Sequence, residues 1–163
     1  MPPEAGTASA VNAPVIEIEN LSHRYGERTA LDAVSFGVAA AEIFGLLGPN
    51  GSGKTTLFRI LSTLMLSSSG SARVMGFDAA QSPAAVRRKI GVVFQAQSID
   101  VKLTATENLR HQGHLYGLKG APLATAISKL LTTVGRLDRA GELVERLSGG
   151  MQRRLNIGCS LLH

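Results

Sequence analysis

Alternating apolar and polar positions in the first part of the chain predict short strands. Residues 15–19 (VIEIE) and 34–38 (VSFGV) alternate in this way, which is typical of half-buried strands. The residues 25–28 (YGER) between them favour a turn, so we expect an antiparallel pair. Two mainly apolar runs, 41–47 (AEIFGLL) and 90–94 (IGVVF), predict buried core strands instead.

Between these two runs the pattern changes to helices and one more strand. Residues 54–64 (KTTLFRILSTL) indicate a helix that follows the first apolar run after a short loop. A break at 67–70 (SSSG) precedes a further strand at 72–76 (ARVMG). Serine and proline at positions 82–83 then open a helix, because serine favours the N-cap and proline the first helical position.

The second half of the chain has helical signals. Thr104 and Glu107 have the spacing of a capping box, in which each side chain accepts a hydrogen bond from the backbone of the other residue. We expect a helix through residues 108–116, another over 122–134, and a last helix capped by Ser148. Strands and helices together predict an α/β fold.

Composition limits the classes of protein that remain. The 163 residues are 44% apolar and 4% aromatic, which allows one core and therefore one domain or a large piece of one. The net charge is +5, but the basic residues are scattered over predicted helices without interleaved aromatic side chains, so we expect no nucleic-acid partner. The longest apolar run falls short of the roughly 18 residues that indicate a membrane span. Any membrane role must therefore come through a partner.

The single cysteine and the first 14 residues bear on where the protein is expected to lie in the cell. Cys159 is the single cysteine, and its apolar neighbours predict an inert buried thiol in a protein of the cytosol. Residues 1–14 lack the basic start and apolar stretch of a secretory signal, so we expect a disordered leader.

Residues 48–55 (GPNGSGKT) match the phosphate-loop pattern G-x-x-x-x-G-K-[ST] between a predicted strand and a predicted helix. Backbone N–H groups of such a loop surround phosphate oxygens at the helix N-terminus. We expect Lys54 to reach the β- and γ-phosphates and the Thr55 hydroxyl to bind Mg²⁺. The alternative is a glycine-rich surface turn, which would not need Lys-Thr at the helix start. The residues assigned to the nucleotide are Gly48, Pro49, Asn50, Gly51, Ser52, Gly53, Lys54, Thr55 and Thr56.

Together with residues 147–151 (LSGGM), this loop resembles the ATP-binding subunit, or nucleotide-binding domain, of an ABC transporter, from Val15 to His163. The segment 115–118 (LYGL) and the run that follows LSGG are similar to the daunorubicin-type (ABC-2) group of drug and antibiotic exporters. The resemblance implies a P-loop NTPase core (RecA-like) with an antiparallel β subdomain and a helical subdomain at about 96–147. The domain is expected to be incomplete at its C-terminus.

The same resemblance assigns roles to residues outside the phosphate loop. Tyr25 is similar to the aromatic residue that stacks on adenine, although a tyrosine in a turn is more often structural. Gln95 corresponds to the glutamine that touches Mg²⁺ and the attacking water. Ser148, Gly149 and Gly150 resemble the signature sequence, which contacts the γ-phosphate held by a second copy; the alternative is an ordinary capped helix.

The resemblance also implies ATP and Mg²⁺ as cofactors and a head-to-tail dimer with a second ATP-binding subunit. A separate membrane-spanning permease subunit would hold the protein at the cytoplasmic face of the membrane. A soluble ABC-type ATPase that acts on DNA or ribosomes is the other reading left open, whereas a small GTPase is disfavoured because no Asn-Lys-x-Asp segment occurs.

One part of the family pattern is missing from the printed sequence. The family has an apolar strand closing in an aspartate, then a catalytic glutamate and a switch histidine, and none of the three occurs up to His163. The earlier candidates Asp78, Asp100 and Asp138 do not end a run of four apolar residues. We therefore expect these 163 residues on their own to bind nucleotide without hydrolysing it.

Overall fold

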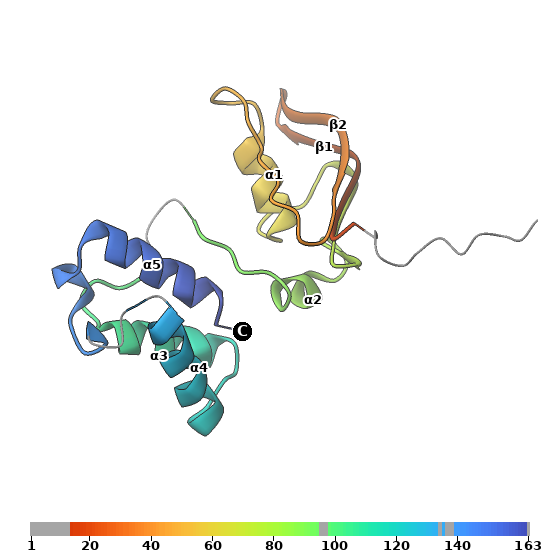
Figure 1. Cartoon of the computed structure of the whole chain (residues 1–163). Helices are drawn as coiled ribbons and strands as arrows, with labels where there is room; N and C mark the ends of the chain where they lie inside the picture. Colours follow the sequence, from red (N-terminus) through yellow and green to blue (C-terminus); the bar gives the residue numbers. More distant parts are fainter. Residues whose placement is uncertain (1–13, 95–97, 134, 136–138, 163) are drawn as a thin grey trace, which may run out of the picture. The chain divides into compact units, whose positions relative to one another are not determined.

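The computed structural model describes residues 14–94, 98–133, 135 and 139–162. The chain forms two compact units, Met1–Ile90 and Gly91–His163 (Figure 1). The expected leader at 1–14 lies outside the described residues except for Pro14.

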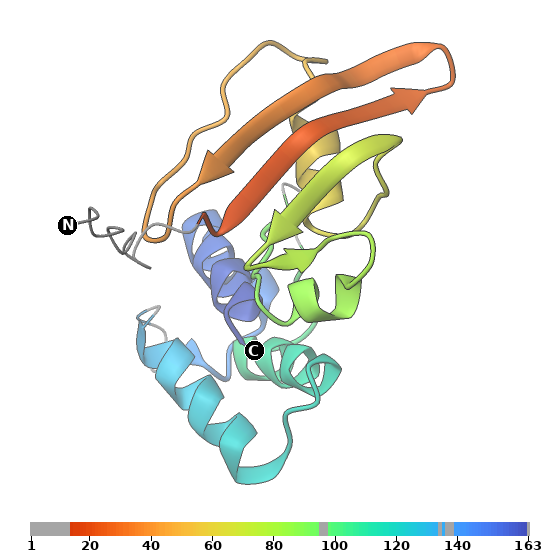
Figure 2. The ribbon, with the colours of Figure 1, turned by 90° about the vertical axis from the view of Figure 1, so that its right-hand side faces the viewer.

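The first unit contains a four-stranded sheet in the order β2-β1-β3-β4, in which every neighbouring pair is antiparallel (Figure 2). Its strands are β1 (Ile16–Tyr25), β2 (Arg28–Val38), β3 (Ser69–Val74) and β4 (Phe77–Asp78). The predicted antiparallel pair is confirmed, and its strands are longer than the alternation indicated.

An irregularity in β1 explains the difference in length. Ile18 and Leu21 are both buried although they are three residues apart, and the register shifts between them. Asn20, in this interval, has a positive φ of 47°. A bulge of this kind interrupts the two-residue period, so the sequence pattern stops before the strand does.

Helix α1 (Lys54–Leu61) packs on the sheet and completes the core of the first unit. Leu57 and Ile60 face Leu21 and its buried neighbours in the sheet. The helix is shorter than the predicted 54–64, because Thr63 adopts a left-handed conformation with φ of 61°. Burial of this apolar face is the main stabilising contribution to the unit.

Helix α2 (Pro83–Arg87) begins where the sequence predicted. Proline occupies the start of the helix, whereas the Ser82 side chain makes no capping hydrogen bond. The fixed φ of proline therefore marks this start.

The two predicted core strands are wrong. In the run 41–47, the side chains of Ile43 and Leu47 are 101% and 94% exposed, and Phe44 stacks on Phe36 of β2 with ring centroids 5.0 Å apart. The run 90–94 likewise forms no strand. Neither run pairs with a strand anywhere in the part of the chain that the structure describes. Apolar composition favours burial, but a strand also needs a neighbour for its N–H and C=O groups.

The second unit is helical, as the sequence predicted. It contains α3 (Ala105–Leu115), α4 (Gly120–Thr133), the short 3₁₀ helix η2 (Val144–Arg146) and α5 (Gly149–Ser160). The core of this unit is formed by Leu109, Leu123, Leu131, Leu155 and other apolar residues from these helices. A Cβ on Gly113 would lie 2.2 Å from Leu123 Cδ1, so this glycine permits the close approach of α3 and α4.

The capping box at the start of α3 is confirmed. The Thr104 N–H donates to Glu107 Oε2 at 2.7 Å, and the Glu107 N–H donates to Thr104 Oγ1 at 3.2 Å. Hydrogen bonds from the Thr104 backbone and hydroxyl lower the pKa of the Glu107 carboxyl. The box therefore fixes the first turn of α3.

Cys159 is buried in α5, and burial raises its thiol pKa to about 11, which confirms the inert thiol. Within the described ranges, no helix has the length and apolar character needed to cross a bilayer.

Replacement of Thr104 by alanine should lower the free energy of unfolding by about 1 kcal/mol, because a first-turn N–H of α3 loses its acceptor. Urea titration followed by circular dichroism measures this loss. Thr133→Ala is the matched control, since its exposed hydroxyl bonds only to the Lys129 carbonyl four residues earlier. Equal losses in the two threonine variants would contradict the role of the box.

The stabilising effect of Glu107 should disappear as pH falls below 4.5, because the pKa of its carboxyl in the folded protein lies below that ordinary value.

Candidate nucleotide-binding site

The phosphate loop of the first unit passes very close to β2. Gly53 is the N-cap of α1 with φ of 87°, and a Cβ at this residue would lie 2.3 Å from the Ala30 carbonyl oxygen. Gly48, the other glycine that the motif fixes, also has a positive φ, of 156°, as does Gly51 at an open position of the motif, with 85°. At Gly53, the glycine that the motif requires is thus required by backbone conformation and by the neighbouring strand.

The N-terminus of α1 presents free hydrogen-bond donors to the loop. No side chain caps this helix, and its first turn contains no acidic residue. The amides of Lys54, Thr55 and Thr56 belong to the first turn, where an α-helix has no internal acceptors. Together with the helix dipole, these amides favour an anion.

The Lys54 side chain folds back over the loop that precedes it. Its Nζ donates to the carbonyls of Gly48 and Pro49, both at 2.6 Å, and to Ser52 Oγ at 3.3 Å. These acceptors carry only partial charges, and no carboxylate among the described residues pairs with Lys54. The ammonium charge is therefore held at the loop and is not neutralised there.

Tyr25 and the phosphate loop line the same pocket. A pocket of about 240 Å³ is lined by Tyr25, Arg28, Ala30, Asn50, Gly51, Gly53, Lys54, Thr55 and Thr56. Tyr25 is 45% exposed, and its hydroxyl lies 3.3 Å from both Thr56 Oγ1 and Met65 Sδ. The hydroxyl contacts position the ring while part of its surface remains accessible to a ligand.

Arg28 and Ala30 are the two pocket residues that the sequence patterns did not indicate, and Arg28 is the charged one. It follows Tyr25 by three positions and faces it directly across the β1–β2 turn. A two-residue turn brings its flanking residues together, so the YGER segment contained the signal.

Of the other residues assigned to the nucleotide, Gly48, Pro49 and Ser52 belong to the loop but do not line this pocket, and Ser148, Gly149 and Gly150 belong to the second unit. Gln95 lies outside the described residues, so its role stays a prediction. Ser148 belongs to the second unit, where its Oγ caps α5 by accepting the Met151 N–H at 3.4 Å. Gly149 and Gly150 are exposed, with open space where a Cβ would be. The predicted cap is confirmed.

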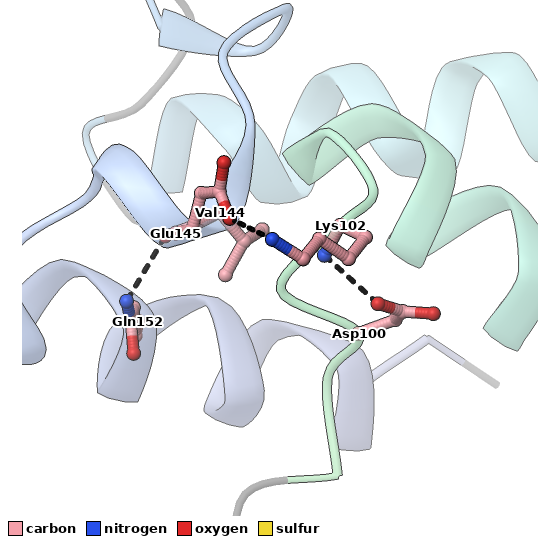
Figure 3. Close-up of polar contacts among 5 residues, drawn as sticks. All are labelled: Asp100, Lys102, Val144, Glu145 and Gln152. Atoms are coloured by element: carbon pink, nitrogen blue, oxygen red, sulfur yellow. Dashed lines mark hydrogen bonds and ion pairs between the residues drawn. The ribbon is translucent and has the colours of Figure 1, made fainter.

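Polar contacts hold the segment that precedes Ser148 (Figure 3). Lys102 Nζ binds Glu145 Oε2 at 2.5 Å, and the Lys102 N–H donates to Asp100 Oδ1 at 2.8 Å. The hydrogen bond and opposite charges raise the pKa of Lys102 and lower that of Glu145. Gln152 Nε2 donates to the Val144 carbonyl at 3.0 Å. These contacts connect η2 both to the loop before α3 and to the first turn of α5.

Comparison with known proteins gives a family match. A family model described as "ABC transporter" matches residues 31–163. A linearmycin resistance ATP-binding protein of Bacillus subtilis (strain 168) is 39% identical over 149 residues, which are 91% of this chain and 48% of that protein. A daunorubicin/doxorubicin resistance ATP-binding protein of Streptomyces peucetius is 40% identical over 147 residues, which are 90% of this chain and 44% of the relative. The chain thus spans about half the length of these curated relatives.

Solved structures agree with the α/β fold of a P-loop NTPase domain. The ATP-binding subunit of an ABC transporter superposes with a TM-score of 0.77 at 28% identity, over 91% of this chain and 62% of the other. The cbiO1 chain of Clostridium perfringens, part of the ABC transporter complex cbiONQ, has a TM-score of 0.82 at 21% identity, over 91% and 61%. The second likeness concerns the fold alone.

Replacement of Gly53 by alanine should be more destabilising than replacement of Gly76, although both residues have positive φ values, of 87° and 80°. A methyl group at Gly76 would meet no atom within 4 Å. Gly76→Ala should therefore lower the free energy of unfolding by only about 1–2 kcal/mol, the cost of a left-handed backbone conformation for a residue with a Cβ. At Gly53 the added methyl also meets the Ala30 carbonyl, which adds about 1–3 kcal/mol. Urea unfolding of both variants measures the difference. Equal losses would show that β2 does not restrict the loop.

Proposed function

The chain belongs to the ABC transporter family of ATP-binding proteins, and we propose that its first unit binds ATP with Mg²⁺ on the phosphate loop. The family implies ATP binding and hydrolysis. In the full-length protein, hydrolysis would drive export through a separate membrane subunit. Two relatives are named for resistance to linearmycin and to daunorubicin or doxorubicin, which supports a role in export.

The observation that carries the proposal is the composition of the pocket at the N-terminus of α1. A nucleotide has a flat base at one end and an anionic chain at the other. The pocket offers the Tyr25 ring for the base, and the Lys54 ammonium with the uncapped α1 N-terminus for the phosphates. We assign adenine stacking to Tyr25, phosphate binding to residues 48–56, and a Mg²⁺ ligand to the Thr55 hydroxyl.

The uncapped N-terminus of α1 and the Lys54 ammonium, which has no carboxylate partner among the described residues, fit a phosphate group. Gly53 allows the backbone to turn into α1 close against β2, where no side chain would fit between the loop and the strand. When bound, Mg²⁺ would neutralise part of the phosphate charge. Lys54 would exchange its carbonyl contacts for phosphate oxygens, since a full negative charge attracts the ammonium more strongly than partial ones.

The proposal extends to a head-to-tail dimer. Ser148, Gly149 and Gly150 would contact the γ-phosphate held by a second ATP-binding subunit, and Gln95 would contact Mg²⁺ and the attacking water. The capped but exposed N-terminus of α5 supports the signature role. Within residues 15–163, the helical subdomain would cover about 96–147. A permease partner would hold the dimer at the cytoplasmic face of the membrane.

ATP or a slowly hydrolysed analogue should raise the melting temperature of the chain when Mg²⁺ is present. A ligand at about 100 times its Kd adds about 2.7 kcal/mol to the free energy of unfolding. Lys54→Ala should abolish most of the shift, because the phosphates lose their main cation. Lys89→Ala is the matched control, an exposed lysine of the same unit outside the pocket. Differential scanning fluorimetry makes the measurement, and no shift of the wild type at millimolar ATP would reject the proposal.

A second candidate function is nucleotide binding without turnover by these 163 residues alone. The carboxylates of Asp78 and Asp100 serve local turns, since Asp78 Oδ1 accepts the N–H groups of Ala80 and Gln81, and Asp100 Oδ1 that of Lys102. Asp138 lies outside the described residues. No described aspartate lines the pocket at the phosphate loop, where it could hold a metal or a water.

Phosphate release by the 163-residue chain should not exceed that of Lys54→Ala at saturating ATP and Mg²⁺. The physical reason is that no carboxylate of the described residues lines the pocket, where one would be needed to orient the attacking water. A colorimetric phosphate assay over several hours makes the comparison. If the 163-residue chain releases phosphate and Lys54→Ala abolishes that release, the second candidate function is contradicted and the binding proposal remains intact.

A further inference from the structure

We propose that Arg28 is a further nucleotide-binding residue, which contacts the phosphate chain from the β2 side of the pocket. The inference rests on the proposed binding of ATP and adds a residue to that site. It concerns the first unit only.

The position of Arg28 follows from the β1–β2 hairpin. It is the first residue of β2 and pairs in register with Tyr25, the last residue of β1. Both residues line the pocket that contains Lys54. The hairpin therefore places an aromatic ring and a guanidinium side by side at one edge of the site.

The guanidinium of Arg28 reaches the phosphate loop. Its Nη2 atom lies 3.1 Å from the position that a Cβ on Gly51 would occupy. Gly51 is part of the loop whose backbone is expected to surround phosphate oxygens. The cation is thus next to the anion-binding part of the pocket.

The charge of Arg28 is not neutralised within the protein. Glu27, the adjacent acidic residue, contacts Arg24, with Arg24 Nη2 3.8 Å from Glu27 Oε2. None of the described residues forms an ion pair with Arg28, and the pocket lining includes no acidic side chain. Two cations without a carboxylate create a positive potential that favours a polyanion over a neutral ligand.

Arginine suits this role for a geometric reason. Its planar guanidinium presents paired N–H donors that match two phosphate oxygens, which a lysine cannot do. Lys54 lies on the α1 side of the loop and Arg28 on the β2 side. The phosphate chain would therefore be bound between two cations from different elements.

The test compares the affinities of AMP, ADP and ATP, with Mg²⁺ present, by isothermal titration calorimetry. Arg28→Ala should weaken ATP binding by about tenfold, the effect of one charge-assisted hydrogen bond, and AMP binding much less. Arg28→Lys keeps the charge and should retain part of the ATP affinity. The matched control is Arg73→Ala, an exposed arginine of β3 outside the pocket, which should bind all three nucleotides like the wild type.

The outcomes separate this inference from the proposed function. If the wild type binds ATP and Arg28→Ala binds it with the same affinity, the role of Arg28 is overturned and the proposed function is preserved. Equal weakening of AMP and ATP also overturns it, because the arginine would then act on a group that both nucleotides contain, the base, the ribose or the α-phosphate, and not on the rest of the phosphate chain. A wild type that binds no nucleotide overturns both. Melting of each ligand-free variant shows whether the hairpin still folds, and Arg28→Lys supplies the comparison if the alanine variant does not.

Discussion

The close approach of Gly53 to the Ala30 carbonyl of β2 is the constraint on which the nucleotide site depends. Because no side chain fits between them, the phosphate loop can turn sharply into α1 against the strand. This contact fixes where α1 begins, and therefore where its unpaired amides and Lys54 lie. The same strand begins at Arg28, opposite Tyr25. One backbone contact thus connects the loop end of the pocket, which we propose binds phosphates, with the Tyr25 end, which we propose binds the base.

Helices α3 and α5 of the second unit have N-termini capped by side chains, whereas α1 of the first unit does not. Thr104 and Ser148 cap α3 and α5 with their side chains, so part of the first-turn N–H requirement is met within the protein. At α1 the N-cap is Gly53, which has no side chain to offer. Its donors are available to a ligand, and the neighbouring cations Lys54 and Arg28 lack carboxylate partners among the described residues. Donors and charge thus favour an anion at α1.

Sequence patterns predicted the elements whose causes are local. The turn at 25–28, the capping box at Thr104 and the Ser148 cap each depend on residues within four positions of one another, and all three are present. The apolar runs 41–47 and 90–94 were predicted as strands and are not. Apolar character indicates a preference for burial, whereas strand formation depends on a partner that the run itself does not contain. The bulge at Asn20 was missed for a related reason, since pairing on both sides of β1 determines it.

The sequence by itself determined the family, the phosphate-loop motif and the caps at Thr104 and Ser148, because each depends on short segments whose chemistry lies in their own residues. The Ser82 cap, which the sequence also predicted, does not form. Only the tertiary structure decided that Tyr25 and Arg28 line the same pocket as Lys54, 26 or more positions later in the chain. It also decided that Gly53 lies against β2. These are contacts between elements, set by packing of α1 on the sheet and by strand pairing. Such contacts join residues distant in sequence, so no local pattern contains them.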